Sequence, residues 1–159
     1  MTKKVVKEEK KKEKGVNDNA VPNFVAMESC VGVVSMLAAK SKNHKHLFMS
    51  DLEWLVLPPI MLKQFKIFRA ENNEPAAFVS YAKVNQEVEK RLLSGVVKLA
   101  PKDWNSGDRI WIIDVIDLVG KATSTILKQL AEKEFKGQEV RILSRKKDGS
   151  GVEGKVLSY

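Results

Sequence analysis

The stretch Asp103-Trp104-Asn105-Ser106-Gly107-Asp108-Arg109-Ile110-Trp111-Ile112-Ile113-Asp114-Val115-Ile116-Asp117 decides how this chain folds. It leads from a polar loop, 101–109, into an apolar run, 110–119. Side chains alternate between the two faces of a strand, so a period of two residues sorts the run into two sets. These sets are Ile110, Ile112, Asp114, Ile116 and Leu118, and Trp111, Ile113, Val115, Asp117 and Val119. Both are largely apolar, which predicts a central strand covered on both sides.

Helices and strands alternate on either side of this strand. Apolar residues at helical spacing predict helices over 22–40, 86–93 and 121–136, the second capped by Asn85 and the third closed by Gly137. Alternating or β-branched runs predict strands over 65–68, 76–84, 140–144 and 152–159, and a short apolar segment, 47–57, stops at Pro58-Pro59. The order predicts an α/β (α+β) domain with a mixed central sheet flanked by helices and no internal repeat.

Composition limits the class of protein further. A chain of 159 residues with 43% hydrophobic residues suits one globular domain, which we place at 21–159 after a disordered Lys-rich tail, 1–20. No apolar run reaches the ~18 to 20 residues of a membrane span, and no secretory signal is visible. The single cysteine, Cys30, excludes an internal disulfide and suits core packing, so we expect a cytoplasmic protein.

The charge of +8 is concentrated at the N-terminus, where residues 1–14 hold seven lysines and three glutamates. A solvated tail explains this run more simply than nucleic-acid binding, because sites for single-stranded nucleic acid interleave basic residues with aromatic ones and the tail has no aromatic residue. We therefore expect no nucleic-acid partner. A positive surface would also attract an acidic protein.

Two residue types in the folded part suggest chemistry. Asp114 interrupts an apolar strand, and a buried carboxylate must be paired, hydrogen-bonded or protonated. It is either a satisfied core residue or a group that orients a base. His44 and His46 lie in a Lys-rich loop without a third ligand, so we predict no metal site, but an imidazole with a pKa of ~6.5 suits proton transfer. Ser41, three residues before His44, is either a cap or a neighbour of the site.

Several motifs together resemble one family, the toxin-activating lysine acyltransferases (hemolysin-activating proteins, HlyC-like) encoded beside RTX toxins. The resemblance covers roughly residues 25–145 and is most specific in the loop and strand quoted first. The matching segments are Asp103-Trp104-x-Ser106-Gly107-Asp108-Arg109-x-Trp111-x-Ile113-Asp114-x-Ile116, Ser41-Lys42-Asn43-His44, Val56-Leu57-Pro58 with Gln64, and Pro75-Ala76-Ala77-Phe78-Val79-Ser80-Tyr81-Ala82.

The resemblance implies a single-domain GNAT-like acyltransferase fold and a defined reaction. The donor would be a fatty acyl chain on acyl carrier protein, with no tightly bound cofactor. The acceptor would be internal lysines of an RTX protoxin, whose activation makes it cytolytic and hemolytic. The family's essential histidine and aspartate map onto His44 and Asp114. Ser41 and Arg109 are possible supporting residues, and relatives suggest a homodimer.

The chemistry of these residue types fits that reaction. A lysine amine with a pKa of ~10.4 must lose a proton before it attacks a thioester, so His44 would be the general base and Asp114 would orient it. A covalent acyl-histidine is the competing mechanism. Lys40, Lys42 and Lys45 would steer the acidic carrier protein, and the first helix or the face of Ile112 and Ile116 would line an acyl groove.

One segment departs from the family pattern. After Ile116 the family commonly has Ala-Pro-Phe-Gly, whereas this chain has Asp117-Leu118-Val119-Gly120. The difference predicts a divergent member with its own acyl preference or partner. It also leaves a second hypothesis open, that of a catalytically inactive or chaperone-like partner-binding module of the same fold.

Overall fold

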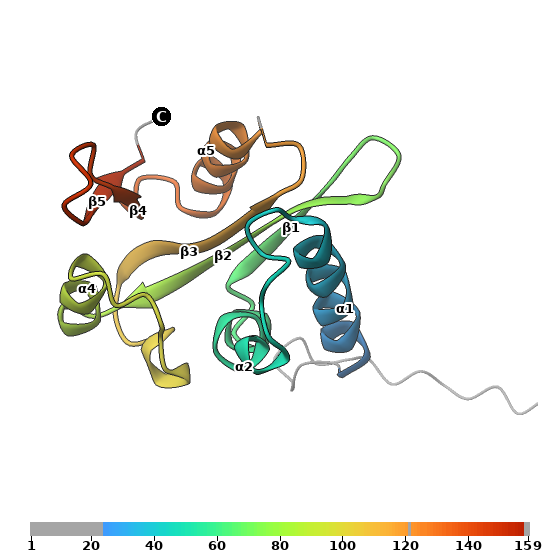
Figure 1. Cartoon of the computed structure of the whole chain (residues 1–159), viewed down its shortest axis with the longest axis horizontal. Helices are drawn as coiled ribbons and strands as arrows, with labels where there is room; N and C mark the ends of the chain where they lie inside the picture. Colours follow the sequence, from blue (N-terminus) through green and yellow to red (C-terminus); the bar gives the residue numbers. More distant parts are fainter. Residues whose placement is uncertain (1–23, 121, 158–159) are drawn as a thin grey trace, which may run out of the picture.

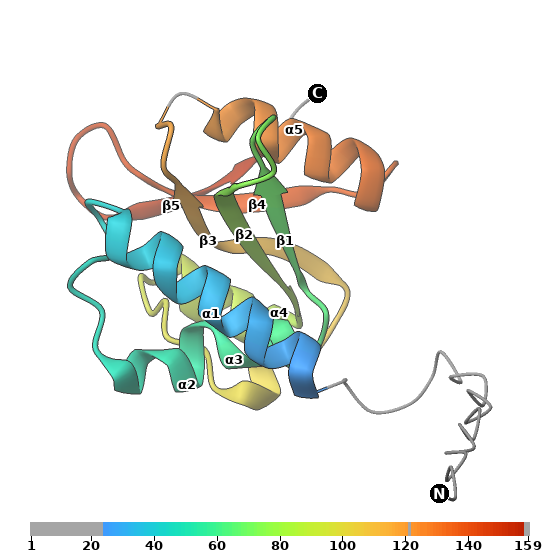
Figure 2. The ribbon, with the colours of Figure 1, turned by 90° about the vertical axis from the view of Figure 1, so that its right-hand side faces the viewer.

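The computed structural model describes residues 24–120 and 122–157, so the tail predicted for 1–20 lies outside the described residues and the domain boundary at 21 stays a prediction. The described helices and strands follow one another as the sequence predicts (Figures 1 and 2). In chain order they are α1 (Phe24–Lys40), the 3-10 turn η1 (Met49–Asp51), α2 (Leu52–Leu55), α3 (Leu57–Met61), β1 (Phe65–Arg69), β2 (Pro75–Val84), α4 (Gln86–Leu93), η2 (Pro101–Asp103), β3 (Arg109–Asp117), α5 (Thr123–Glu134), β4 (Val140–Arg145) and β5 (Val152–Val156).

The five strands form one mixed sheet in the order β1-β2-β3-β4-β5. Neighbouring strands run antiparallel except β3 and β4, which are parallel and are joined through α5. Helix α5 covers one face, and α1 to α4 cover the other (Figure 1). The predicted class is confirmed: a single-domain, GNAT-like α/β fold with β3 at the centre of the sheet, covered on both sides.

Local chemistry explains where several elements begin. The side chain of Asn85 accepts a hydrogen bond from the backbone N–H of Val88 at 2.9 Å, which confirms the predicted cap of α4. The prediction that Pro58 and Pro59 stop an apolar segment is wrong. Both lie in the first turn of α3, where a missing N–H costs no helical hydrogen bond.

The face assignment predicted for the central strand is wrong from Asp114 onward, because β3 contains a β-bulge. Ser80 of β2 pairs with Asp114, but the next residue, Tyr81, pairs with Ile112, so Ile113 is an extra residue in β3. Ile110 and Ile112 pack toward α5, whereas Ile116 packs with α1 and α3 on the other face. The register places Asp114 on the face of α1, with Ser80 and Phe78 of β2.

The loop before β3 is a rigid support for that strand. Trp104 is completely buried, and Asp103 accepts a hydrogen bond from the Ala100 N–H and pairs with Arg91 at 2.9 Å. Gly107 lies against the end of β2, where an added Cβ would be 2.5 Å from the carbonyl oxygen of Val84. Only glycine fits this approach, so the loop residues fix the start of β3 through packing and hydrogen bonds.

Candidate active site

The predicted pair of functional residues meets across the fold. His44 lies in the turn after α1, and Asp114 lies beside the bulge of β3, 70 residues later. Nε2 of His44 and Oδ1 of Asp114 are 2.8 Å apart. Their side chains are 12% and 15% exposed, so the contact is largely shielded from water but not fully enclosed.

The turn after α1 aims the imidazole. The backbone N–H groups of His44 and Lys45 both bond the carbonyl oxygen of Ser41, and the N–H of Ser41 bonds the last carbonyls of α1. The hydroxyl of Ser41 reaches the ring, with Oγ 2.9 Å from Nδ1 of His44. Both ring nitrogens are therefore held, and Ser41 is a direct neighbour of the site.

The two contacts fix the tautomer of the neutral ring. An ionised carboxylate can only accept hydrogen bonds, so Nε2 of His44 carries the hydrogen that it donates to Asp114. Nδ1 is then the lone-pair nitrogen, and the hydroxyl of Ser41 donates to it. In this tautomer Nδ1 is the nitrogen that can accept a proton, and the carboxylate of Asp114 lies where it can compensate the resulting positive charge.

Asp114 also makes His44 a stronger base. The hydrogen bond from His44 to Asp114 is the largest influence and raises the pKa of the imidazole above its usual value. Burial opposes this rise, and the negative charge of Asp114 adds to it more weakly. Oδ1 of Asp114 accepts a second hydrogen bond, from the backbone N–H of Val115 at 3.0 Å. The backbone of β3 thus holds the carboxylate in position for the imidazole.

An apolar cavity of about 150 Å³ opens beside this pair. Phe48 and Met49 at its edge are 75% and 83% exposed, which leaves apolar surface uncovered next to the imidazole. The cavity lies against α1 and Ile116, as predicted for an acyl groove, but Ile112 lies on the other face of the sheet. Its lining residues are Val34, Ser35, Ala38, Ala39, His44, Lys45, Leu47, Phe48, Met49, Leu52, Val56, Asp114 and Ile116.

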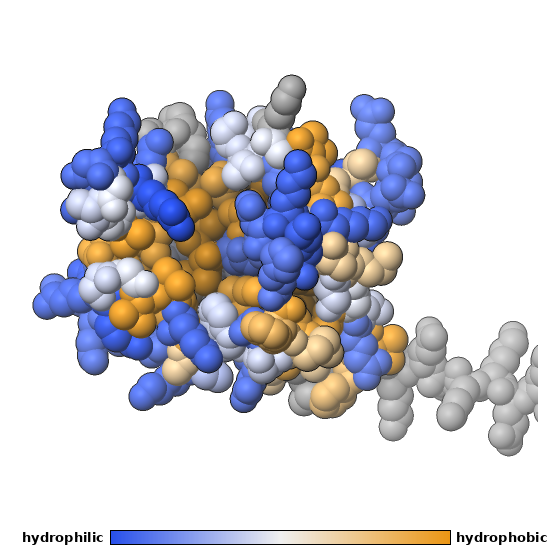
Figure 3. Space-filling model, viewed as in Figure 1, coloured by the Kyte–Doolittle hydropathy of each residue, from blue (hydrophilic) through white to orange (hydrophobic). Residues whose placement is uncertain are grey.

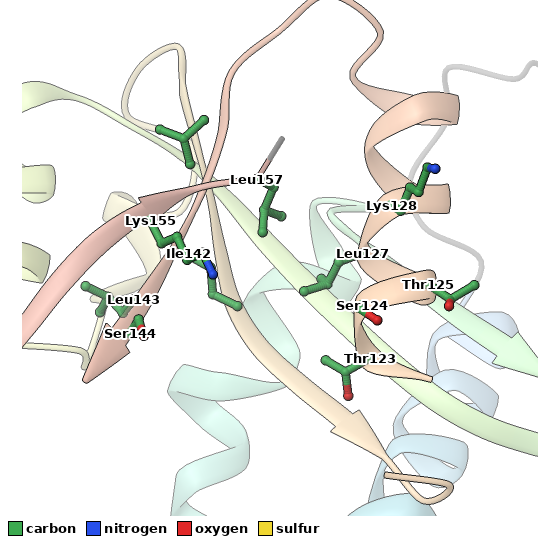
Figure 4. A pocket seen from close by; sticks show the side chains of 11 residues that line it. Thr123, Ser124, Thr125, Leu127, Lys128, Ile142, Leu143, Ser144, Lys155 and Leu157 are labelled. Atoms are coloured by element: carbon green, nitrogen blue, oxygen red, sulfur yellow. The ribbon is translucent and has the colours of Figure 1, made fainter. Parts of the chain in front are cut away.

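A larger cavity, about 680 Å³, lies between α5 and the β4–β5 hairpin and includes neither His44 nor Asp114 in its lining. It opens where β3 and β4 separate, because these strands pair only from Ile110 to Ile112. In the space-filling view the molecule is hollowed here and the hollow is lined by apolar surface (Figure 3). Leu127, Ile142 and Leu157 line its interior, and the Thr123 and Ser124 hydroxyls lie at the start of α5 (Figure 4).

The other candidate residues from the sequence lie apart from this pair. Arg109 forms an ion pair with Glu89 of α4 at 3.1 Å, and the same carboxylate accepts hydrogen bonds from Trp111 and Arg141. His46 is exposed. Asp117 accepts hydrogen bonds from the Val119 and Gly120 N–H groups and from the Thr123 hydroxyl.

The described residues hold neither a metal cluster nor a membrane-spanning helix. Within 24–120 and 122–157, no three His, Cys, Asp or Glu side chains are grouped so that they could hold a metal ion. No helix in the same part of the chain has the length and apolar character needed to cross a membrane.

An imidazole with a raised pKa, oriented by a carboxylate at the wall of an apolar cavity, can accept a proton from a group bound beside it. This site lies on a GNAT-like sheet. The RTX toxin acyltransferase family matches residues 23–158, and the chain belongs to this family.

Individual relatives are similar over most of the chain. The lysine-acyltransferase RtxC of Vibrio cholerae is 31% identical over 126 residues, which cover 77% of this chain and 81% of the relative. The RTX-II toxin-activating lysine-acyltransferase ApxIIC of Actinobacillus pleuropneumoniae is 35% identical over 74% of each chain. The protein-lysine myristoyltransferase HlyC of Escherichia coli is 38% identical over 54% of this chain and 49% of its own.

Proposed function

We propose that this protein transfers a fatty acyl chain from acyl-acyl carrier protein to the amines of internal lysines of an RTX protoxin and so activates the toxin. The observation that carries the proposal is the 2.8 Å contact between His44 and Asp114 at the wall of the apolar cavity. The names of the relatives supply the acceptor, since they include toxin-activating and protein-lysine acyltransferases.

His44 acts as the general base in this proposal. The acceptor amine reaches His44 as the Ser41 hydroxyl rotates aside, and its proton passes to Nδ1 as the nitrogen attacks the thioester carbonyl carbon. Asp114 stabilises the imidazolium that forms. When the tetrahedral intermediate collapses, the carbon–sulfur bond breaks and the Nδ1 proton passes to the sulfur of the leaving thiol. The N–C bond of the amide replaces the S–C bond of the thioester.

The two cavities suit two parts of the donor. The apolar cavity beside His44 takes the acyl chain, and the exposed Phe48 and Met49 extend its apolar surface. The cavity at α5 offers the hydroxyl of Ser124 with Lys128 and Lys155, groups that suit the phosphate of the carrier's prosthetic arm. The thioester would lie between them, at the bulge of β3.

Charge supports an acidic carrier protein as the donor's partner. The chain has a net charge of +8, and Lys40, Lys42 and Lys45 surround the turn that holds His44. Such a surface speeds the encounter with an acidic partner and loses this effect at high ionic strength. A cytoplasmic location and a homodimer stay predictions.

The test uses purified protein, acyl carrier protein loaded with a myristoyl or palmitoyl chain, and the cognate protoxin, with lysine peptides analysed by mass spectrometry. Wild-type protein should add the acyl mass to lysine. His44→Ala should abolish the transfer, whereas His46→Ala, which removes an exposed histidine two residues away, should retain it. Undiminished acylation by His44→Ala would overturn the assignment of His44 as the general base. Absence of lysine acylation by the wild type would overturn the proposed function.

A further inference from the structure

Ser80 carries a buried hydroxyl that makes no hydrogen bond within the described part of the chain. Its exposed fraction is 0%, and its Oγ has no hydrogen-bond partner among residues 24–120 and 122–157. A hydroxyl removed from water without a partner is unfavourable, so buried ones are normally hydrogen-bonded. Stability alone would favour alanine here, which makes the serine a candidate for a functional role.

The register of the sheet gives Ser80 one polar neighbour. It lies in β2 between β1 and β3, where it pairs with Phe65 on one side and Asp114 on the other. The next residues along β2 on the same face are Phe78 and Ala82. Asp114 is therefore the only polar side chain among these four nearest neighbours on the face.

The carboxylate of Asp114 has a free acceptor for this hydroxyl. Oδ1 accepts from both Nε2 of His44 and the N–H of Val115, and no hydrogen bond reaches Oδ2 within the described part of the chain. Directly opposed residues of an antiparallel pair have Cβ atoms about 4.5–5.5 Å apart. Oδ2 of Asp114 is therefore the acceptor that the register offers to the hydroxyl of Ser80.

We infer that Ser80 is a positioning residue for the acyl-transfer step, and that its hydroxyl donates to Oδ2 of Asp114 when His44 takes up the proton of the acceptor amine. This inference rests on the proposed function. The bond holds the plane of the carboxylate against the imidazolium, and because it forms with the protonated ring it stabilises that state. Ser80 therefore adds to the rise that Asp114 causes in the pKa of His44, and it stabilises the state in which the ring holds the proton of the acceptor amine.

Ser80→Ala tests the inference through activity. The rate of acyl transfer should fall roughly tenfold, less than the ~10²- to 10⁴-fold that a general base supplies. The thermal midpoint should stay at or above that of the wild type, since the lost hydroxyl has no partner in the resting structure. Ser80→Cys keeps a similar shape but has a weaker donor, so its rate of acyl transfer should lie between those of the wild type and Ser80→Ala. Ser94→Ala, which removes an exposed hydroxyl, is the control and should leave the rate unchanged.

Two readouts separate positioning from packing. In Ser80→Ala the pKa of His44, followed by NMR of its ring without any substrate, should move downward, and the rising limb of the pH–rate profile should move with it. In an Asp114→Asn background, Ser80→Ala should have no further effect on the rate. An unchanged pKa in Ser80→Ala, or full additivity of the two substitutions, would overturn the inference. A wild type inactive on protoxin would overturn the proposed function instead, while the NMR titration would still test Ser80.

Discussion

Replacing Asp114 by asparagine keeps the shape of the side chain and removes its charge, so it tests the reaction mechanism with little change in packing. The amide oxygen still accepts from Nε2 of His44, 2.8 Å away, but it no longer compensates an imidazolium. Two unit charges about 4 Å apart attract by about 4 kcal/mol at an effective dielectric constant of about 20. Since ~1.4 kcal/mol is a factor of ten in rate, transfer should slow about 10³-fold.

Asp114→Asn should also move the pH dependence in a defined direction. In the wild type the raised pKa of His44 places the rising limb of the pH–rate profile above 6.5, because the base must be neutral to accept a proton. Without the carboxylate, the remaining influence is burial, which lowers the pKa, so the limb should fall below 6.5. The assay is initial-rate acylation of protoxin between about pH 5.5 and 9, within the span where histidine titrates.

Stability provides the second measurement on the same variant. A hydrogen bond to a charged group is worth about 1.5–3 kcal/mol and a neutral one about 0.5–1.5 kcal/mol, so Asp114→Asn should lose about 1 kcal/mol near pH 8. The raised pKa of His44 contributes stability that is fully present below 6.5 and is lost as the pH rises through that raised value. The deficit of the variant should therefore grow as the pH falls toward about 6.

Asp117→Asn is the matched control, since Asp117 lies on the same strand and accepts three hydrogen bonds without contacting His44. It should lose stability but keep the wild-type pH–rate profile. A folded Asp114→Asn protein with the wild-type rate and profile would refute the assignment of Asp114. Loss of folding in that variant would show that the carboxylate is mainly structural.

Three further substitutions probe other parts of the site and its support. Ser35→Leu fills the cavity beside His44 from α1 and should shift the preference toward shorter acyl chains, measured with donors of different chain length; an unchanged preference would place the chain elsewhere. Ser41→Ala removes the hydroxyl that holds Nδ1 of His44 and should reduce the rate of acyl transfer less than about tenfold, a smaller loss than removal of the general base would cause. Complete loss of activity would instead favour an acyl-serine route. Gly107→Ala places a Cβ 2.5 Å from the Val84 carbonyl oxygen and should destabilise the protein by about 2 kcal/mol or more in urea unfolding, and a neutral effect would contradict the close approach.

The residues of the candidate site can largely be predicted from the sequence. A carboxylate within an apolar strand and a histidine in a basic loop are local features, and the family motifs assign them roles through residue order and spacing alone. The cap at Asn85 and the central position of β3 also follow from local patterns, and the fold confirms them. Each depends on a residue's own chemistry or on spacing along the chain.

The contacts that define the site depend on the tertiary structure. Strict alternation assigns Asp114 to the face of Ile110 and Ile112, and one extra residue in β3 moves it to the face of α1. A bulge is set by how two strands align, so the sequence of β3 alone carries no sign of it. Ser80 resembles an ordinary strand residue until the register places it opposite Asp114.

By itself, the sequence determined which elements form and which side chains can carry chemistry, because propensity, capping and burial patterns act over a few residues. Only the tertiary structure decided that Nε2 of His44 meets Asp114, that Nδ1 is left as the basic nitrogen, and that an apolar cavity lies beside them. These outcomes require segments 70 residues apart to pack at atomic distances, and packing of that kind is a property of the whole folded chain.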